Sequence, residues 1–157
     1  MLYLIGVNHS VQHDGRAVHH GQEIERLREG FAEFIVRTAQ QTHAKVIAEE
    51  NNQEVLEKFA ATKSVAFTVA AELGIRHLFC EPSIAERKRL GISLTGSPAD
   101  YEKREKYWLE KLRPIVEVPI LFILGADHIA SFSELAKSSG LPVSVAVEYY
   151  GRKHFAS

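Results

Sequence analysis

The chain has 157 residues, of which 45% are hydrophobic and 25% are charged, and its formal net charge is −1. These values are typical of a soluble globular protein, and the length predicts a single domain over residues 1–157. The near balance of charge argues against a general nucleic-acid-binding protein, although it leaves room for a local basic patch. With Cys80 as its one cysteine, the chain forms no intrachain disulfide and no cysteine-rich zinc site.

The sequence shows no targeting or membrane-spanning pattern. The apolar run at the N-terminus is only a few residues long, has no basic start and is followed by no signal-peptide cleavage pattern. No apolar run approaches the ~20 residues that a bilayer-spanning helix needs. We therefore expect a cytoplasmic protein that makes no membrane contact.

The first half of the chain is predicted to alternate strands and helices. Residues 1–7 form a short apolar strand, and the polar residues 10–21 form a long loop of a kind that is often functional in a compact domain. Apolar residues at helical spacing predict a long amphipathic helix over residues 22–42. A second strand is expected over residues 44–49.

Two further helices and a third strand are predicted next. Residues 54–61 and 64–73 have helical patterns, and a glycine follows the second of them. The apolar residues 75–80 indicate the third strand, and residues 84–89 indicate a short helix. This order continues the strand–helix alternation.

A buried arginine is predicted on the next helix. A serine cap at Ser97, followed by proline, starts a helix that runs to about Leu112. Tyr101 and Trp108 lie on its buried stripe, and Arg104 lies between them at helical spacing. Such a charge either pairs with a carboxylate or extends along the surface into solvent, and the sequence leaves both open.

The most apolar stretch of the chain is residues 120–124, which predict a strand buried on both faces. It ends at Gly125, and a helix follows with Asp127 as its expected cap and His128 on its inward face. Both residues also have a purely structural interpretation, as a cap and a near-core histidine. Residues 141–148 predict the last strand.

The alternation predicts an α/β fold, with a mostly parallel sheet of about five strands flanked by helices on both faces. Ligands of such sheets bind outside the carboxyl ends of the strands. Residues that close a predicted strand are His9, Glu49, Glu50, Glu81, His128 and Glu148.

Two imidazoles beside two or three carboxylates suit a divalent metal such as zinc, manganese or cobalt. A catalytic metal would leave one position open for a water molecule, whose pKa it lowers towards neutrality. A second carboxylate would then act as general base. We therefore expect a divalent metal to bind among His9, His128 and the glutamates that close the strands.

Four short motifs in order resemble the TraB/Tiki superfamily, which includes ChaN-like and erythromycin-esterase-like proteins. Gly6-Val7-Asn8-His9 and Gly125-Ala126-Asp127-His128 match its two Gly-x-x-His motifs. Glu49-Glu50 matches its acidic pair, and Arg104 its helical arginine. The similarity extends from residue 6 to residue 128, and the chain looks like a minimal member.

The resemblance implies a metal-dependent hydrolase of ester, amide or peptide bonds, acting on a small molecule or peptide. It implies that His9, His128 and either Glu49 or Glu50 bind or act beside the metal, so the candidate ligands are His9, Glu49, Glu50 and His128. Catalytic roles are expected for Glu50, Arg104 and His128, with Arg104 holding a carboxylate or the substrate. This chain is shorter than typical members and has little room for the inserted helices that build a substrate pocket. A homodimer would supply the missing wall.

Two alternatives belong to other functional classes. A haem- or metal-binding protein without enzymatic activity is suggested by ChaN-like relatives, with His13, His19 and His20 as candidate axial ligands. Strand-end carboxylates do not favour haem iron, which weakens that interpretation. The other alternative is a regulatory or interaction module with an idle site. A cysteine nucleophile at Cys80 is less favoured than a buried cysteine acting as a small hydrophobe.

Overall fold

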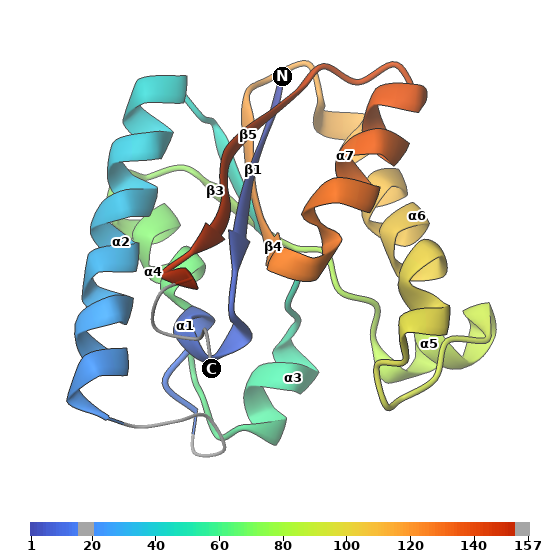
Figure 1. The fold of residues 1–157 in the computed structure, drawn as a ribbon, viewed down its shortest axis with the longest axis horizontal. Coiled ribbons are helices and arrows are strands. Elements are labelled where there is room, and N and C mark those ends of the chain that lie inside the picture. The colour runs from blue at the N-terminus through green and yellow to red at the C-terminus, as the bar shows by residue number, and fades with distance from the viewer. Residues whose placement is uncertain (16–20, 153–157) are drawn as a thin grey trace.

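Five strands form one parallel sheet in the computed structural model, which describes residues 1–15 and 21–152 (Figure 1). Their order across the sheet is β3-β2-β4-β1-β5, so β4 and β1 are central and β3 and β5 are the edges. The strands are β1 Leu2–Val7, β2 Val46–Glu49, β3 Arg76–Phe79, β4 Ile120–Gly125 and β5 Val143–Tyr150. The predicted α/β fold is confirmed.

Helices connect these strands and cover both faces of the sheet (Figure 1). The α-helices are α1 His9–Gln12, α2 Gln22–Thr42, α3 Gln53–Lys58, α4 Val65–Leu73, α5 Ile84–Leu90, α6 Tyr101–Leu112 and α7 Ile129–Ser138. Short 3-10 turns are η1 Pro98–Asp100, η2 Arg113–Ile115 and η3 Ala126–His128. No described helix is long and apolar enough to cross a membrane.

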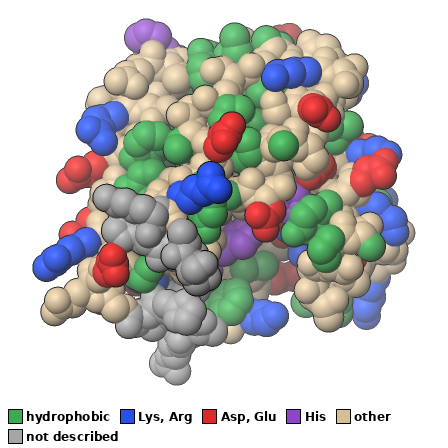
Figure 2. Space-filling model, in the orientation of Figure 1, with side chains coloured by type: hydrophobic (Ala, Val, Ile, Leu, Met, Phe, Trp, Pro, Cys, Tyr) green, Lys and Arg blue, Asp and Glu red, His purple; other side chains and the backbone are tan. Residues whose placement is uncertain are grey.

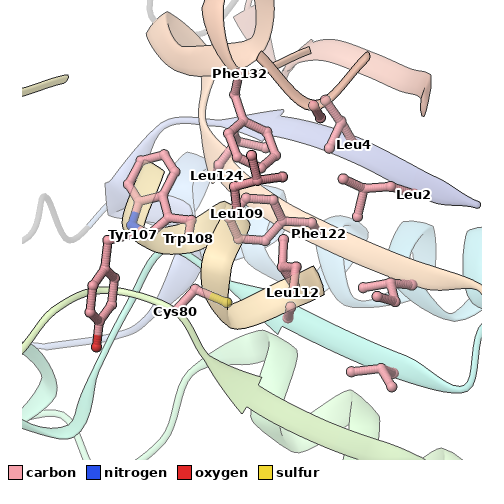
Figure 3. Close-up of a cluster of buried hydrophobic side chains, with 14 of the residues drawn as sticks. Leu2, Leu4, Cys80, Tyr107, Trp108, Leu109, Leu112, Phe122, Leu124 and Phe132 are labelled. Carbon is pink, nitrogen blue, oxygen red and sulfur yellow. The ribbon is translucent and has the colours of Figure 1, made fainter. Parts of the chain in front are cut away.

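The alternation of side chains along each strand divides the core into two layers. Along β4, Phe122 faces α6 and α7, while its neighbours Leu121 and Ile123 face α2 and α4. Figure 3 shows the first layer, where Trp108 of α6 and Phe132 of α7 meet Phe122. Because both layers are filled, polar groups that function together are left to the strand ends.

Gly6 allows β1 to lie close to β5 and α7. A Cβ atom at Gly6 would come within 1.9 Å of the Glu148 carbonyl oxygen and 2.8 Å of Ile129 Cγ1. Contacts this short are impossible for a real Cβ atom. The first Gly-x-x-His motif therefore has a packing reason for its glycine.

Three expectations about local structure are wrong. The polar stretch after β1 begins with a helix, α1, because Asn8 caps it by accepting from the Ser10 amide. Glu148 does not close a strand: β5 continues to Tyr150, which leaves Glu148 exposed within an edge strand. Asp127 does not cap α7, since His128 is the N-cap and no side chain of the described residues makes the capping bond.

Candidate functional site

A pocket of about 490 Å³ opens at the carboxyl end of the sheet, bordered by segments that follow β1, β2 and β4. In Figure 2, histidine side chains lie in a hollow on the face viewed, with hydrophobic side chains at its border. Four of the predicted site residues line the pocket, together with Glu81; these four are His9, Glu50, Arg104 and His128. The structure therefore brings together residues that are up to 119 positions apart, from His9 to His128.

Glu50 is a buried carboxylate with a partner on each oxygen. Its Oε2 accepts from the Gly125 amide at 2.6 Å, and its Oε1 accepts from Arg104 Nη2. Burial by itself raises the pKa of Glu50, but His9 when protonated, Arg104, His128 when protonated and the Gly125 amide lower that pKa below its ordinary value. Glu50 is therefore ionised at neutral pH.

Arg104 joins two buried glutamates. Its Nε donates to Glu81 Oε1 at 3.1 Å, and its Nη2 donates to both Glu81 Oε2 at 3.0 Å and Glu50 Oε1. Burial lowers the pKa of Arg104, but the two carboxylates outweigh this and raise the pKa above its ordinary value. Of the two alternatives for Arg104, the structure shows the carboxylate pair, because the side chain is buried rather than extended into solvent.

Glu81 receives two more donors. Trp108 Nε1 donates to its Oε2 at 3.1 Å, and Arg87 of α5 donates to its Oε1. A buried carboxylate needs such compensation because it has lost its water. Glu81 is thus the anchor that fixes Arg104 on the side away from Glu50.

His128 is buried behind Arg104. Its Nδ1 lies 2.7 Å from Glu105 Oε1, and the Ser131 hydroxyl donates to the same oxygen at 2.6 Å. Its Nε2 lies 3.4 Å from Arg104 Nη1 and 3.8 Å from Glu50 Oε1. This Glu105 oxygen, which accepts from Ser131, also accepts from Nδ1–H, which leaves Nε2 as the ring nitrogen that faces the arginine.

His9 differs from its neighbours because 58% of its side chain is exposed, against 1% for Glu50. Its Nδ1 lies 2.7 Å from Gln12 Oε1, and its Nε2 lies 3.7 Å from Glu50 Oε1. The amide oxygen can only accept, so Nδ1 carries the proton and the neutral ring has its lone pair on Nε2. A Cβ atom at Gly125 would come within 3.0 Å of His9 Nε2, so the second Gly-x-x-His motif makes room for the first.

Glu49 is not part of this pocket. Side chains alternate along β2, so Glu49 lies on the opposite face from Glu50, in the layer of α2 and α4. There it accepts from the Ser64 hydroxyl and lies 2.7 Å from His77 Nε2. The acidic pair therefore contributes one carboxylate to each side of the sheet.

The donors in the pocket do not fit a divalent metal. Among the described residues, no group of three or more His, Cys, Asp or Glu side chains is placed to hold one. Beside Glu50, the position of a cation is taken by the Arg104 guanidinium, and Glu49 points away. We therefore assign the chemistry of this pocket to its own side chains.

Two residues that fix the histidines were not predicted from the sequence. Glu105 lies at helical spacing from Tyr101 and Leu109, so its place near the buried stripe of α6 was available as a signal. Gln12 holds His9 only because α1 places the two residues one turn apart, and a four-residue helix shows no periodicity.

Neither His13 nor Cys80 is an accessible reactive group. His13 is 4% exposed, stacks on Phe59 and accepts from the Gly15 amide at 3.1 Å, which makes it a poor axial ligand for haem. His19 and His20, the other candidate axial ligands, lie outside the described residues. Burial raises the pKa of the Cys80 thiol, so Cys80 is not an activated nucleophile.

His13 is expected to make the fold sensitive to mild acid. Burial first, and then the charge of Arg28, lower its pKa below the ordinary 6.5, against opposing effects of Glu49 and Asp14. The unfolded chain then binds the proton more readily, so stability is full above pH 6.5 and falls as the pH drops below it. We expect His13→Asn, whose oxygen replaces Nδ1 as acceptor for Gly15, to flatten this fall in urea unfolding between about pH 7.5 and about pH 5.5.

The matched control is His43→Asn. His43 is an exposed residue with φ 54° at the end of α2, a conformation that asparagine tolerates. An equal flattening in both variants would show that losing any histidine has the same effect, and would contradict the role given to His13.

Comparisons with protein-family models, curated proteins and solved structures find no match to this chain. The resemblance to the TraB/Tiki superfamily therefore stays a prediction. The functional assignment depends on the geometry of the pocket.

Proposed function

We propose that this protein is a hydrolase that cleaves an ester or amide bond of a small molecule, with His9 as its general base. The main support for this proposal is the setting of His9, which is exposed in the pocket. Its Nδ1 is held by Gln12, and its Nε2 faces the ionised Glu50. A base fixed through one ring nitrogen presents the other in a defined tautomer. A pocket of about 490 Å³ is also within the usual range for small ligands.

In this proposal a water molecule bound at His9 Nε2 attacks the substrate carbonyl carbon. The proton passes from the water to Nε2, and Glu50, 3.7 Å away, stabilises the imidazolium that forms. The C–O or C–N bond then breaks, and the leaving alcohol or amine takes the proton from His9. The products are a carboxylic acid and the alcohol or amine, so the base is regenerated.

The other charged residues of the pocket hold Glu50 in place beside His9. Both oxygens of Glu50 are occupied and its pKa is lowered, so Glu50 is a weak base and serves better as a fixed negative charge. Arg104 positions Glu50, and His128 packs behind Arg104 on Glu105. In this assignment Glu50, Arg104 and His128 are positioning residues.

The test is hydrolysis of p-nitrophenyl acetate by the wild type and by His9→Ala. Losing a general base is expected to lower kcat/KM about a hundredfold. His43→Ala, which removes a histidine from the end of α2, is the control and is expected to keep full activity. Equal activities of the wild type and His9→Ala would contradict the proposal.

Dialysis against EDTA separates this mechanism from the metal-dependent one predicted from the sequence. Hydrolysis by the side chains alone continues after dialysis. An activity that is lost on dialysis and restored by zinc, manganese or cobalt would assign the reaction to a metal instead.

A further inference from the structure

Two buried amide nitrogens beside the pocket have no hydrogen-bond partner among the described residues. They are Gln12 Nε2 and Asn51 Nδ2. Both residues line the pocket, and each is only 2% exposed. A buried N–H without an acceptor costs free energy, and natural proteins contain few of them, so each one requires an explanation.

The contact of Asn51 settles which end of its amide is free, and the end of Gln12 that is free follows from the tautomer of His9. Asn51 Oδ1 accepts from the Asn52 backbone amide at 2.9 Å, so that atom is the oxygen and Nδ2 is the unused donor. Gln12 Oε1 lies 2.7 Å from His9 Nδ1, which leaves Gln12 Nε2 as the unused donor in the tautomer of the proposed base. The same amide of Gln12 thus adjoins both His9 and the pocket.

The unused donors are neutral, whereas the arginines of the pocket are already paired. Arg104 is bonded to Glu50 and Glu81, and Arg87 is bonded to Glu81. A phosphate or carboxylate ligand would need a cation that these pairs have neutralised. Neutral amide donors suit an oxygen that is uncharged in the bound substrate and gains negative charge only during the reaction.

We propose that Gln12 Nε2 and Asn51 Nδ2 bind the carbonyl oxygen of the substrate and stabilise it as an oxyanion. This inference rests on the proposed function. When water adds to the carbonyl carbon, the π electrons move to the oxygen, which the two N–H groups then hold. When the leaving group departs, that electron pair forms the carbonyl again.

The two donors lie slightly back from the surface of the pocket. Each nitrogen exposes less than 1 Å² without substrate, so the proposal requires a small rotation of each terminal amide that turns its N–H towards the substrate oxygen. Torsions at sp³–sp² bonds of this kind are soft. In this proposal the oxygen of the bound substrate supplies the acceptor that the two amide donors lack.

Asn51→Asp tests the proposed oxyanion hole, and Gln53→Glu is its control. Both replace a terminal amide by a carboxylate, and Asn51→Asp keeps an oxygen for the bond from the Asn52 backbone amide. Gln53 is exposed, does not line the pocket, and donates to the exposed Glu57 side chain. We expect Asn51→Asp to lower kcat for p-nitrophenyl acetate about a hundredfold with little change in KM, and Gln53→Glu to keep the wild-type kcat.

The outcomes separate the two proposals. If His9→Ala is inactive while Asn51→Asp behaves like Gln53→Glu, the proposed oxyanion hole is wrong and the proposed hydrolase stands. Faster hydrolysis of p-nitrophenyl phosphate than of p-nitrophenyl acetate would also contradict the proposed oxyanion hole.

A wild type without esterase activity would count against the proposed function. In that case a binding experiment tests whether Gln12 and Asn51 hold a carbonyl oxygen. The side-chain amide signals of Gln12 and Asn51 in ¹⁵N-labelled protein are followed by NMR, with the Asn51 signal identified by its loss in Asn51→Asp. We expect them to shift with N-methylacetamide and to stay unchanged with inorganic phosphate. Signals that shift with phosphate alone, or that shift with neither probe, would contradict the proposed oxyanion hole.

Discussion

Replacing Arg104 by alanine is expected to destabilise the fold by about 3–5 kcal/mol. Arg104 is 8% exposed and is bonded to two glutamates that are themselves buried. Its removal leaves Glu50 and Glu81 ionised or forces them to take up protons, and either response costs folding free energy. Urea unfolding measures the effect as a lower midpoint with the slope unchanged.

Two further variants make this test specific. Lys106→Ala on the same helix removes an exposed partner of Glu102 and is expected to change stability by less than about 0.5 kcal/mol. Adding Glu50→Gln to Arg104→Ala removes one of the stranded charges and is expected to restore part of the loss. A stability for Arg104→Ala within about 1 kcal/mol of wild type would show that water replaces the guanidinium.

Replacing Gly6 by alanine is expected to cost about 3 kcal/mol or more, a larger effect than one added methyl group usually has. The new Cβ would lie 1.9 Å from the Glu148 carbonyl oxygen and 2.8 Å from its carbonyl carbon. These are backbone atoms of the neighbouring strand, so no side-chain rotation relieves the contact. Thermal unfolding measures the effect as a lower Tm.

Gly21→Ala is the control for the added methyl group. Gly21 precedes α2 with φ −153°, which any residue adopts, and no atom of the described residues lies within 4 Å of the point that its Cβ atom would occupy. Its unfolding is expected to stay close to that of the wild type. A Gly6→Ala variant as stable as Gly21→Ala would show that β1 and β5 separate easily, contrary to the close packing described.

The alternation of apolar strands and amphipathic helices was enough to predict the parallel sheet and its polar edge. The length of α2 was also predicted, because a 21-residue helix shows its period many times. By contrast, β5 was predicted to end at Glu148. Its pairing with β1 continues to Tyr150 through register shifts, which are a tertiary property.

The acidic pair shows why only part of the site could be predicted. Two successive strand residues point to opposite faces, so one glutamate of the pair had to leave the pocket. Which one leaves depends on the helix layer that packs on each face, and no local pattern encodes that. The roles of Glu105 and Gln12 had the same origin, since each follows from a contact between elements.

The cluster of Glu50, Arg104 and Glu81 also has an evolutionary consequence. Each member occupies a different segment of the chain, and the replacement of any one of them removes a charged partner from another buried member. A lineage that loses one of them by a single base change passes through a poorly folded intermediate before a second change can compensate. We therefore expect the three residues to be retained together, or to be replaced together by uncharged residues.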